Sequence, residues 1–383
     1  MNALVSGVAV VGGKMNTTRW WRHTDRVLII VTIALALLGI LLIGSATHIN
    51  RDGLNLYDFI EKQSAFLIVN LVICAFLQRY DYRQLFRWTP FLYGFNLLTL
   101  VAVMVVGVSA LGAQRWIQIG PISIQPSEFA KLVYIICLAR LLCWNQLDLQ
   151  KWRGLIYVAL FLLPPFILVL LQPDLGTSLV FGAITLGGIY MAGVRFRLLG
   201  KIFGAMVAML PLIWIFVLKE YQKNRILVLF DPERDPFRTG YHVIQSKIAI
   251  GSGGLIGKGL FAGTQSQLNF LPENHTDFIF AVLGEELGLV GVLLLLLLYF
   301  ILLYRGVLIA SSTKDLFGRY IAVGIVSMWL FQIFINIGMT IGIMPVTGIP
   351  LPFLSYGVSS LTVNICGAAL LLNIYTHRKQ LLF

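Results

Sequence analysis

Long apolar runs, separated by short polar segments, dominate the chain. Several of the runs reach the roughly 18 to 20 residues that a helix needs to cross a bilayer. We place ten of them, at residues 27–47, 63–78, 89–110, 127–143, 154–171, 176–194, 199–218, 277–303, 320–344 and 357–376. The pattern predicts an all-α polytopic membrane protein, with a single ten-helix transmembrane domain at 27–376 and tails at 1–26 and 377–383.

Composition and charge distribution agree with this topology. Of the 383 residues, 58% are hydrophobic and 12% are charged, whereas a soluble protein carries about 25% charged residues. With a cytoplasmic N-terminus, the inside segments hold 18 of the 29 Lys and Arg residues, and the short outer connections hold only Arg51, Lys62 and Arg115. Because basic residues concentrate in cytoplasmic loops, we expect both termini to be cytoplasmic.

The connection at 219–276, between the seventh and eighth spans, is the one large extracytoplasmic loop of this topology. It carries seven basic residues, which favours an anionic partner or the head groups of membrane lipids. The cytoplasmic segments account for most of the remaining positive charge, so we expect no nucleic-acid partner. Within the loop, "YHVIQSKIAI", which contains Lys247, has the pattern of a short amphipathic helix on the membrane surface.

The segment "NFLPENHTDFIF" (269–280) places Glu273, His275 and Asp277 at the mouth of a predicted helix. In one interpretation Asn274 is the N-cap and Asp277 its N3 partner, as in a capping box. In the other, Asp277 is a reactive carboxylate above a face of small residues, along which a backbone or a lipid chain approaches. These small residues are Ala281, Gly284 and Gly288. The three titratable groups could also hold a divalent cation such as Mg²⁺.

Other charged residues lie in or beside the predicted spans. Glu128 and Lys131 share a helix face, so they form either a structural ion pair or a cationic site for an anionic substrate. Asp174, in "QPDLGTS", either caps the next helix or lines a cavity. Glu285 and Glu286 are costly at membrane depth, which leaves a buried pair with a basic partner or a functional role equally open.

Several classes of chemistry lack their sequence signatures. The chain has no H-E-x-x-H or G-x-S-x-G motif, so neither zinc hydrolysis nor serine catalysis is indicated. "GSGGLIGKG" lacks the Ser or Thr and the preceding strand of a phosphate loop, so we expect no nucleotide cofactor. Irregular, glycine- and proline-rich segments at 251–267 and 344–357 are tolerated near apolar spans only in protein or along a wet cavity. We therefore expect a cavity on the outer side.

Five segments together resemble one known family. They are "QRWIQIGPISIQPSEFAK", "QPDLGTS", "GYHVIQSKIAIGSGGLIGKG", "GTQSQLNFLPENHTDFIFAVLGEELGLVG" and "MPVTGIPLPFLSYGVSS". The chain resembles the SEDS family (shape, elongation, division, sporulation) over about residues 24–380, and its elongation branch more than its division branch. Val358 departs from the pattern, because the family usually has a second glycine there.

The resemblance implies a peptidoglycan glycosyltransferase that polymerises lipid II on the outer face of the bacterial cytoplasmic membrane. The family's essential aspartate corresponds to Asp277, and its cavity residues correspond to Arg115, Trp116, Glu128 and Lys131. The implied partner is a class B penicillin-binding protein, whose transpeptidase cross-links the new glycan.

The residues suit this chemistry. A carboxylate can take the proton of the acceptor hydroxyl, which attacks the anomeric carbon with a single inversion, and cations stabilise the departing pyrophosphate. We predict Asp277 as general base, with Arg115, Lys131 and Lys247 or Mg²⁺ facing phosphate, and with Asp174 and His275 as further substrate contacts. Two alternatives remain: a lipid II flippase, and a non-catalytic scaffold for cell-wall enzymes.

Overall fold

The computed structural model describes residues 24–48, 58–110, 113–120, 122–144, 147–235, 239–268 and 270–378. These residues are mostly helical. The helices are α2 (Arg26–Ala46), α3 (Asp58–Leu77), α4 (Leu85–Val106), α5 (Pro126–Leu142), α6 (Trp152–Leu171), α7 (Leu175–Met191), α8 (Phe196–Leu212), α9 (Glu220–Phe230), α10 (Thr239–Gly253), α11 (Thr264–Gln267), α12 (Ile279–Ser312), α13 (Leu316–Ile341) and α14 (Val358–His377). Short turns η1 (Tyr82–Gln84), η2 (Ile213–Val217) and η3 (Pro232–Arg234) adjoin them. Most of both predicted tails lies outside the described residues.

A helix occupies each of the ten predicted runs. Within the described residues, seven helices are long and apolar enough to cross a membrane: α2, α3, α4 with η1, α6, α12, α13 and α14. The chain is therefore a multi-pass membrane protein. Helices α5, α7 and α8 have 17 residues each, so the count of ten spans stays a prediction.

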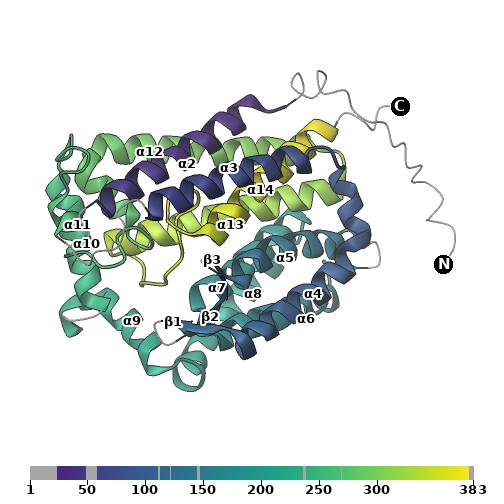
Figure 1. The fold of residues 1–383 in the computed structure, drawn as a ribbon. Coiled ribbons are helices and arrows are strands. Elements are labelled where there is room, and N and C mark those ends of the chain that lie inside the picture. The colour runs from purple at the N-terminus through teal and green to yellow at the C-terminus, as the bar shows by residue number, and fades with distance from the viewer. Residues whose placement is uncertain are drawn as a thin grey trace.

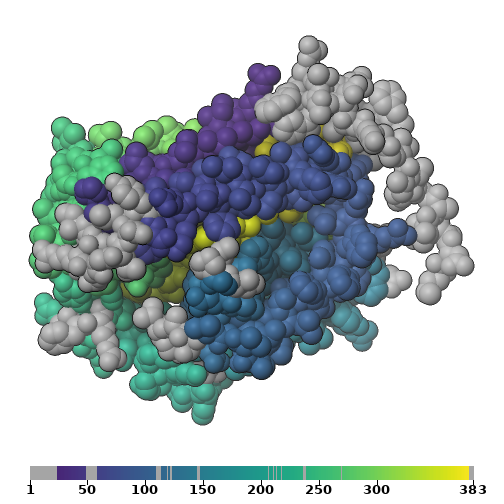
Figure 2. All heavy atoms as spheres, in the orientation of Figure 1, coloured from purple at the N-terminus to yellow at the C-terminus, as the bar shows by residue number. Residues whose placement is uncertain are grey.

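The spans form two groups of helices (Figure 1). One contains α2, α3, α12, α13 and α14, and the other contains α4 to α8. Helix α13 joins the groups by packing against α5 and α7, and α14 packs against α3 and α5. In the space-filling view the surface is hollowed along α14, drawn in yellow, between α3 and α4 (Figure 2). Helix α2 begins and α14 ends at one end of the bundle, whereas α9, α10 and α11 lie at the opposite end (Figure 1).

A small antiparallel sheet interrupts the helical pattern between α4 and α5. It consists of β1 (Val108–Ala110), β2 (Ala113–Ile119) and β3 (Ile122–Ile124), in that order. Isoleucines alternate along β2 and β3, and Ile117 pairs with Ile124, as expected for β-branched residues in strands. The prediction of an all-α protein is wrong in this detail, because these residues pair as antiparallel strands instead of forming a plain connection.

Helix α12 is broken at Gly288, whose φ of 61° and ψ of −159° are not helical. The break frees backbone groups on both sides, and the loop after α10 pairs with them. Lys258 and Gly259 donate their N–H groups to the carbonyls of Glu285 and Glu286 at 3.0 and 2.9 Å. Gly288 is required here, because a Cβ would lie 2.4 Å from the nitrogen of Gly257. The predicted continuous span is therefore two helical pieces.

The face of small residues on α12 is packed against protein. A Cβ on Gly253 of α10 would lie 2.0 Å from the carbonyl oxygen of Gly284, so the two backbones are in close contact. A Cβ on Gly284 would meet Ile250 at 3.1 Å. The close approach of another backbone, one of the two possibilities predicted from sequence, is confirmed. Helix α10 lies where a lipid chain was the alternative.

Candidate active site

Asp277 lies in a turn that precedes α12. The helix begins at Ile279 with Phe278 as N-cap and without a side-chain capping bond. The predicted capping box of Asn274 and Asp277 is therefore wrong. Glu273 adopts a left-handed φ of 51°, and its carbonyl accepts the N–H groups of three following residues, including Asp277 at 3.1 Å. Asn274 instead donates its Nδ2 to the carbonyls of Ala46 and Ser266 at 3.3 and 3.2 Å.

Side chains of α13 and of the segment after it fix the backbone of this turn. Asn336 donates its Nδ2 to the carbonyl of Asp277 at 3.0 Å and to that of Ile349 at 2.8 Å. Ser355 donates its hydroxyl to the carbonyl of Thr276 at 2.6 Å. Gly348, with a φ of 73°, passes so close that its Cβ would lie 3.5 Å from Asp277 Oδ2. The backbone of Asp277 is thus held from two sides.

The Asp277 side chain is half-buried and, among the described residues, accepts no hydrogen bond and makes no ion pair. Its pKa is raised from 3.8 to about 6, first by burial and then by the charge of Glu273. Arg225 lowers this pKa, Asp174 raises it and Arg115 lowers it. We call these five residues the Asp277 charge cluster. A carboxyl group with such a pKa is suited to proton transfer near neutral pH.

Arg115 enters the cluster from β2. Its Nε donates to the carbonyl of Gln172 at 2.9 Å, its Nη2 donates to the carbonyl of Pro173, and its Nη1 lies 3.9 Å from Asp174 Oδ2. Asp174 caps α7, since its Oδ1 accepts the N–H of Thr177 at 3.0 Å. The predicted helix cap is therefore confirmed for Asp174, and Asp174 also belongs to the Asp277 charge cluster. Its predicted role in lining a cavity stays a prediction. Trp116 is the next residue of the strand, so its side chain points to the opposite face.

Glu128 and Lys131 form a buried ion pair in the first turns of α5. Lys131 Nζ lies 2.6 Å from Glu128 Oε1, and the two side chains are 1% and 3% exposed. This is the ion-pair arrangement that the sequence left open. The positive charge of Lys131 is therefore neutralised locally. Substrate contact by either residue stays a prediction.

Lys247 and His275 lie outside the cluster. Lys247 is exposed on α10. Its side chain lies over Gly342, so that a Cβ added to this glycine would be only 2.1 Å from Lys247 Cε. The His275 ring is centred 5.0 Å from Phe59 and 5.7 Å from Tyr356, in an aromatic group. Burial lowers the pKa of His275, which favours its neutral form. Contact of Lys247 or His275 with substrate stays a prediction.

The two glutamates of α12 have different partners. Glu285 is fully buried and accepts hydrogen bonds from Lys258 Nζ at 2.8 Å and from the backbone N–H of Gln265 at 2.9 Å. Glu286 Oε1 accepts the hydroxyl of Ser45 at 2.5 Å. The structural reading with a basic partner is confirmed for Glu285.

No group of three or more His, Cys, Asp or Glu side chains is arranged to hold a metal ion in the part of the chain that the structure describes. Glu273 is exposed, and the His275 ring lies among aromatic rings. The predicted Mg²⁺ ligands therefore do not fit a metal site, and we derive no step through a metal.

Arg225, which α9 places in the Asp277 charge cluster, was not predicted from the sequence. Nor was His242 of α10, whose ring stacks on Phe278 at 5.8 Å between centroids. Neither residue belongs to a local motif with a recognisable chemistry. The only available signal was the basic character of the long loop.

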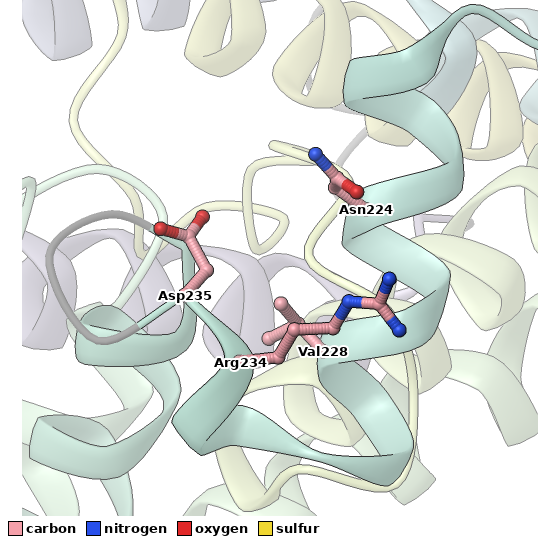
Figure 3. A pocket seen from close by; sticks show the side chains of 4 residues that line it. All are labelled: Asn224, Val228, Arg234 and Asp235. Carbon is pink, nitrogen blue, oxygen red and sulfur yellow. The ribbon is translucent and has the colours of Figure 1, made fainter.

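A hollow of about 290 Å³ opens beside α9 and is lined by Asn224, Val228, Arg234 and Asp235 (Figure 3). Asn224 and Val228 come from α9, and Arg234 and Asp235 come from η3 and the residue after it. The hollow contains none of the predicted site residues. It is therefore distinct from the predicted site, although Val228 belongs to the buried side of α9.

Comparison with known proteins gives consistent matches over nearly the whole chain. A family model covering FtsW, RodA and SpoVE, described as cell cycle protein, matches residues 25–380. The peptidoglycan glycosyltransferase MrdB of Escherichia coli (strain K12) is 43% identical over 94% of this chain and 95% of its own. The stage V sporulation protein E of Bacillus subtilis (strain 168) is 38% identical over 93% of this chain and 98% of its own.

Solved structures agree. A chain from a study of how a peptidoglycan synthase complex coordinates polymerization and crosslinking matches with a TM-score of 0.80 and 36% identity, over 94% of this chain and all of that chain. The rod shape determining protein RodA of Thermus thermophilus matches with a TM-score of 0.68 and 33% identity, over 94% of this chain and 99% of that chain. Because the family model and these relatives match nearly the whole chain, the chain belongs to the FtsW/RodA/SpoVE family of cell cycle proteins.

Proposed function

We propose that this chain is a peptidoglycan glycosyltransferase that polymerises lipid II on the outer face of the bacterial cytoplasmic membrane, with Asp277 as general base. One observation carries the assignment of the base: a half-buried carboxyl group of raised pKa, without a partner among the described residues, lies with two arginines in one cluster. The relatives named peptidoglycan glycosyltransferase support the reaction class.

The proposed step transfers one proton and exchanges one bond. The acceptor hydroxyl gives its proton to Asp277 while its oxygen attacks the anomeric carbon of the donor. The bond from that carbon to the pyrophosphate oxygen breaks, and its electron pair leaves with the pyrophosphate. A positioned base contributes typically 10²–10⁴-fold in rate. Arginine charges stabilise the leaving group, which gains negative charge as the bond breaks.

The charges and the ends of the bundle support one orientation in the membrane. We place both termini in the cytoplasm, ten spans in the bilayer and residues 219–276 outside. In support, α2 begins and α14 ends at the end of the bundle opposite α9, α10 and α11 (Figure 1). This orientation puts Asp277 at the outer surface, where a lipid-linked substrate presents its head group.

The proposed partner is a class B penicillin-binding protein. The similar chain from a peptidoglycan synthase complex, in which polymerization and crosslinking are coordinated, supports such a partner. A polymerase alone produces glycan strands without crosslinks. A transpeptidase bound to the same membrane protein would crosslink them as they emerge.

Polymerisation by the purified protein tests the proposal. We expect glycan strands from lipid II in liposomes, with and without the penicillin-binding protein, and a rate about 10²–10⁴-fold lower for Asp277→Asn. Asp148→Asn is the matched control, because Asp148 is an exposed carboxylate paired with Lys151 in the connection between α5 and α6. Asp148→Asn should keep the wild-type rate.

Other outcomes would separate the alternatives. Polymerisation by Asp277→Asn at the wild-type rate would contradict the assignment of the base. Transfer of lipid II between leaflets without any polymer would instead indicate a flippase. Stimulation of a partner's activity by wild type and Asp277→Asn alike, again without polymer from this chain, would indicate a scaffold.

A further inference from the structure

Arg225 lies on the buried face of α9. Gln222, Arg225 and Val228 follow one another at intervals of three residues, so they share one face of the helix. Gln222 and Val228 are 5% and 1% exposed, and Arg225 is half-buried between them. Val228 belongs to a small hydrophobic cluster with Phe278. This packing turns the Arg225 face of α9 toward the turn that holds Asp277.

Most other cations near the outer end already have partners. Lys131 pairs with Glu128, and Lys258 pairs with Glu285. Arg115 donates its Nε and Nη2 to the carbonyls of Gln172 and Pro173, so it contributes mainly its positive charge, which these neutral carbonyls do not cancel. Lys247 is exposed and lies over Gly342 rather than in the Asp277 charge cluster.

Arg225 differs from these residues. Among the described residues its guanidinium makes no hydrogen bond or ion pair, and its one recorded side-chain contact is with the ring of Tyr221, 5.8 Å from Cζ. A guanidinium carries five N–H donors in a fixed planar arrangement. A half-buried group with this many free donors is suited to bind an anionic ligand.

The charges around Arg225 favour the same interpretation. Burial lowers the pKa of Arg225, Arg115 lowers it further, and Asp277 and Asp174 raise it. Two guanidinium groups thus lie within electrostatic reach of each other in a partly desolvated region. Like charges repel more strongly where water is excluded, and a bound anion between them would remove this repulsion.

We propose that Arg225 binds the diphosphate group of the lipid-linked donor, with Arg115 as the second cation. The inference rests on the proposed function and adds a residue that the sequence did not indicate. Arginine matches phosphate oxygens with two parallel N–H donors. The diphosphate is held beside Asp277, and Arg225 stabilises the negative charge that the diphosphate gains as its bond to the anomeric carbon breaks.

Inorganic pyrophosphate is the direct probe. It should raise the unfolding temperature of the purified protein in a buffer without divalent cations, because a ligand of the native state stabilises that state. In Arg225→Gln the affinity for pyrophosphate should fall by about ten- to hundredfold, since hydrogen bonds to charged groups are worth about 1.5–3 kcal/mol. Arg225→Lys keeps the charge but loses the paired donors, so it should bind with intermediate affinity.

Arg234→Gln is the matched control. Arg234 is an exposed arginine of η3, beside the hollow on α9 (Figure 3), and it lies outside the Asp277 charge cluster. This variant should bind pyrophosphate as the wild type does. Equal stabilisation of wild type and Arg225→Gln by pyrophosphate would overturn the proposal, and so would the absence of any stabilisation of the wild type. If Arg225→Gln does not fold, the affinity of Arg225→Lys decides in the same way.

Kinetics give a second readout. With lipid II as substrate, Arg225→Gln should raise KM and lower kcat, whereas a purely structural role would lower the amount of folded protein and leave both constants unchanged. A failure of the proposed function is distinguishable. If wild type makes no polymer but binds pyrophosphate through Arg225, the anion site stands and the glycosyltransferase assignment falls. If polymerisation occurs and Arg225→Gln keeps the wild-type KM, only this inference falls.

Discussion

Asp277 and Glu285 are carboxylates of the same short segment, yet their surroundings are opposite. Glu285 is fully buried and accepts hydrogen bonds from Lys258, Thr264, Gln265 and Ser266, at 2.8 to 3.3 Å. Asp277 is half-buried and, within the described residues, accepts none. Its backbone is held by Asn336, whereas its carboxylate is affected by burial and by the charges of the Asp277 charge cluster.

The difference is the one expected between a structural carboxylate and the proposed base. A buried carboxylate that is fully hydrogen-bonded stabilises the groups around it, and here it attaches residues 258–266 to α12. A carboxylate without donors keeps its lone pairs free for a substrate proton. The burial that raises its pKa also makes it a better base at neutral pH. The two carboxylates thus differ in the number of hydrogen bonds they accept as well as in their depth in the protein.

The largest effect that tests this comparison is expected at Glu285. Glu285→Gln leaves Lys258 without its counter-charge and weakens the bonds to residues 264–266, so we expect a loss of roughly 3 kcal/mol in stability. The rate of polymerisation per folded molecule should stay near that of the wild type. The unfolding temperature and the specific activity of the folded fraction measure the two quantities. A variant with normal stability and lost activity would show that Glu285 is catalytic and that the comparison is wrong.

Much of the fold could be predicted because membrane-spanning helices are recognisable in the sequence as long apolar runs. Each of the ten runs contains a helix, since a backbone in lipid must satisfy its own hydrogen bonds. The break at Gly288 could not be predicted, because a glycine in an apolar run is equally consistent with close packing. The break depends on Gly254 and Leu255, whose carbonyls accept the N–H groups of Leu289 and Val290. These partners are remote in sequence.

The candidate site, like the fold, could be predicted from the sequence only in part. Asp277 was predicted because the motif and the family resemblance both single it out. Its predicted capping role failed because the left-handed conformation of Glu273 closes the turn before a capping box can form. Arg225 could not be predicted, because α9 comes near Asp277 through tertiary packing, in which Val228 and Phe278 belong to one hydrophobic cluster. Contacts between distant segments leave no local pattern.

The pH dependence of the reaction tests the proposed role of Asp277, and we expect an effect of intermediate size. The base must be ionised, so kcat/KM should fall as the pH drops below the pKa of about 6. Glu273 raises this pKa, so Glu273→Gln should move the acid limb to lower pH and leave the plateau rate unchanged. Glu220→Gln is the control, because Glu220 is an exposed carboxylate paired with Lys223 in α9. An acid limb that stays in place in Glu273→Gln would exclude Asp277 as the group that titrates.

The smallest expected effect is a gain of stability on removal of the Asp277 charge. Because the folded-state pKa of about 6 lies above the ordinary 3.8, folding favours the protonated form. This stabilisation is complete below pH 3.8 and is lost as the pH rises through about 6. The shift of roughly 2 units corresponds to at most about 3 kcal/mol, and partial exposure reduces it, so we expect about 1 kcal/mol. Asp277→Asn should therefore unfold at a higher temperature than the wild type at neutral pH, and the difference should vanish near pH 4. Glu285→Gln should unfold at a lower temperature, and a loss of stability in both variants would mean that Asp277, like Glu285, is held by bonds that the fold requires.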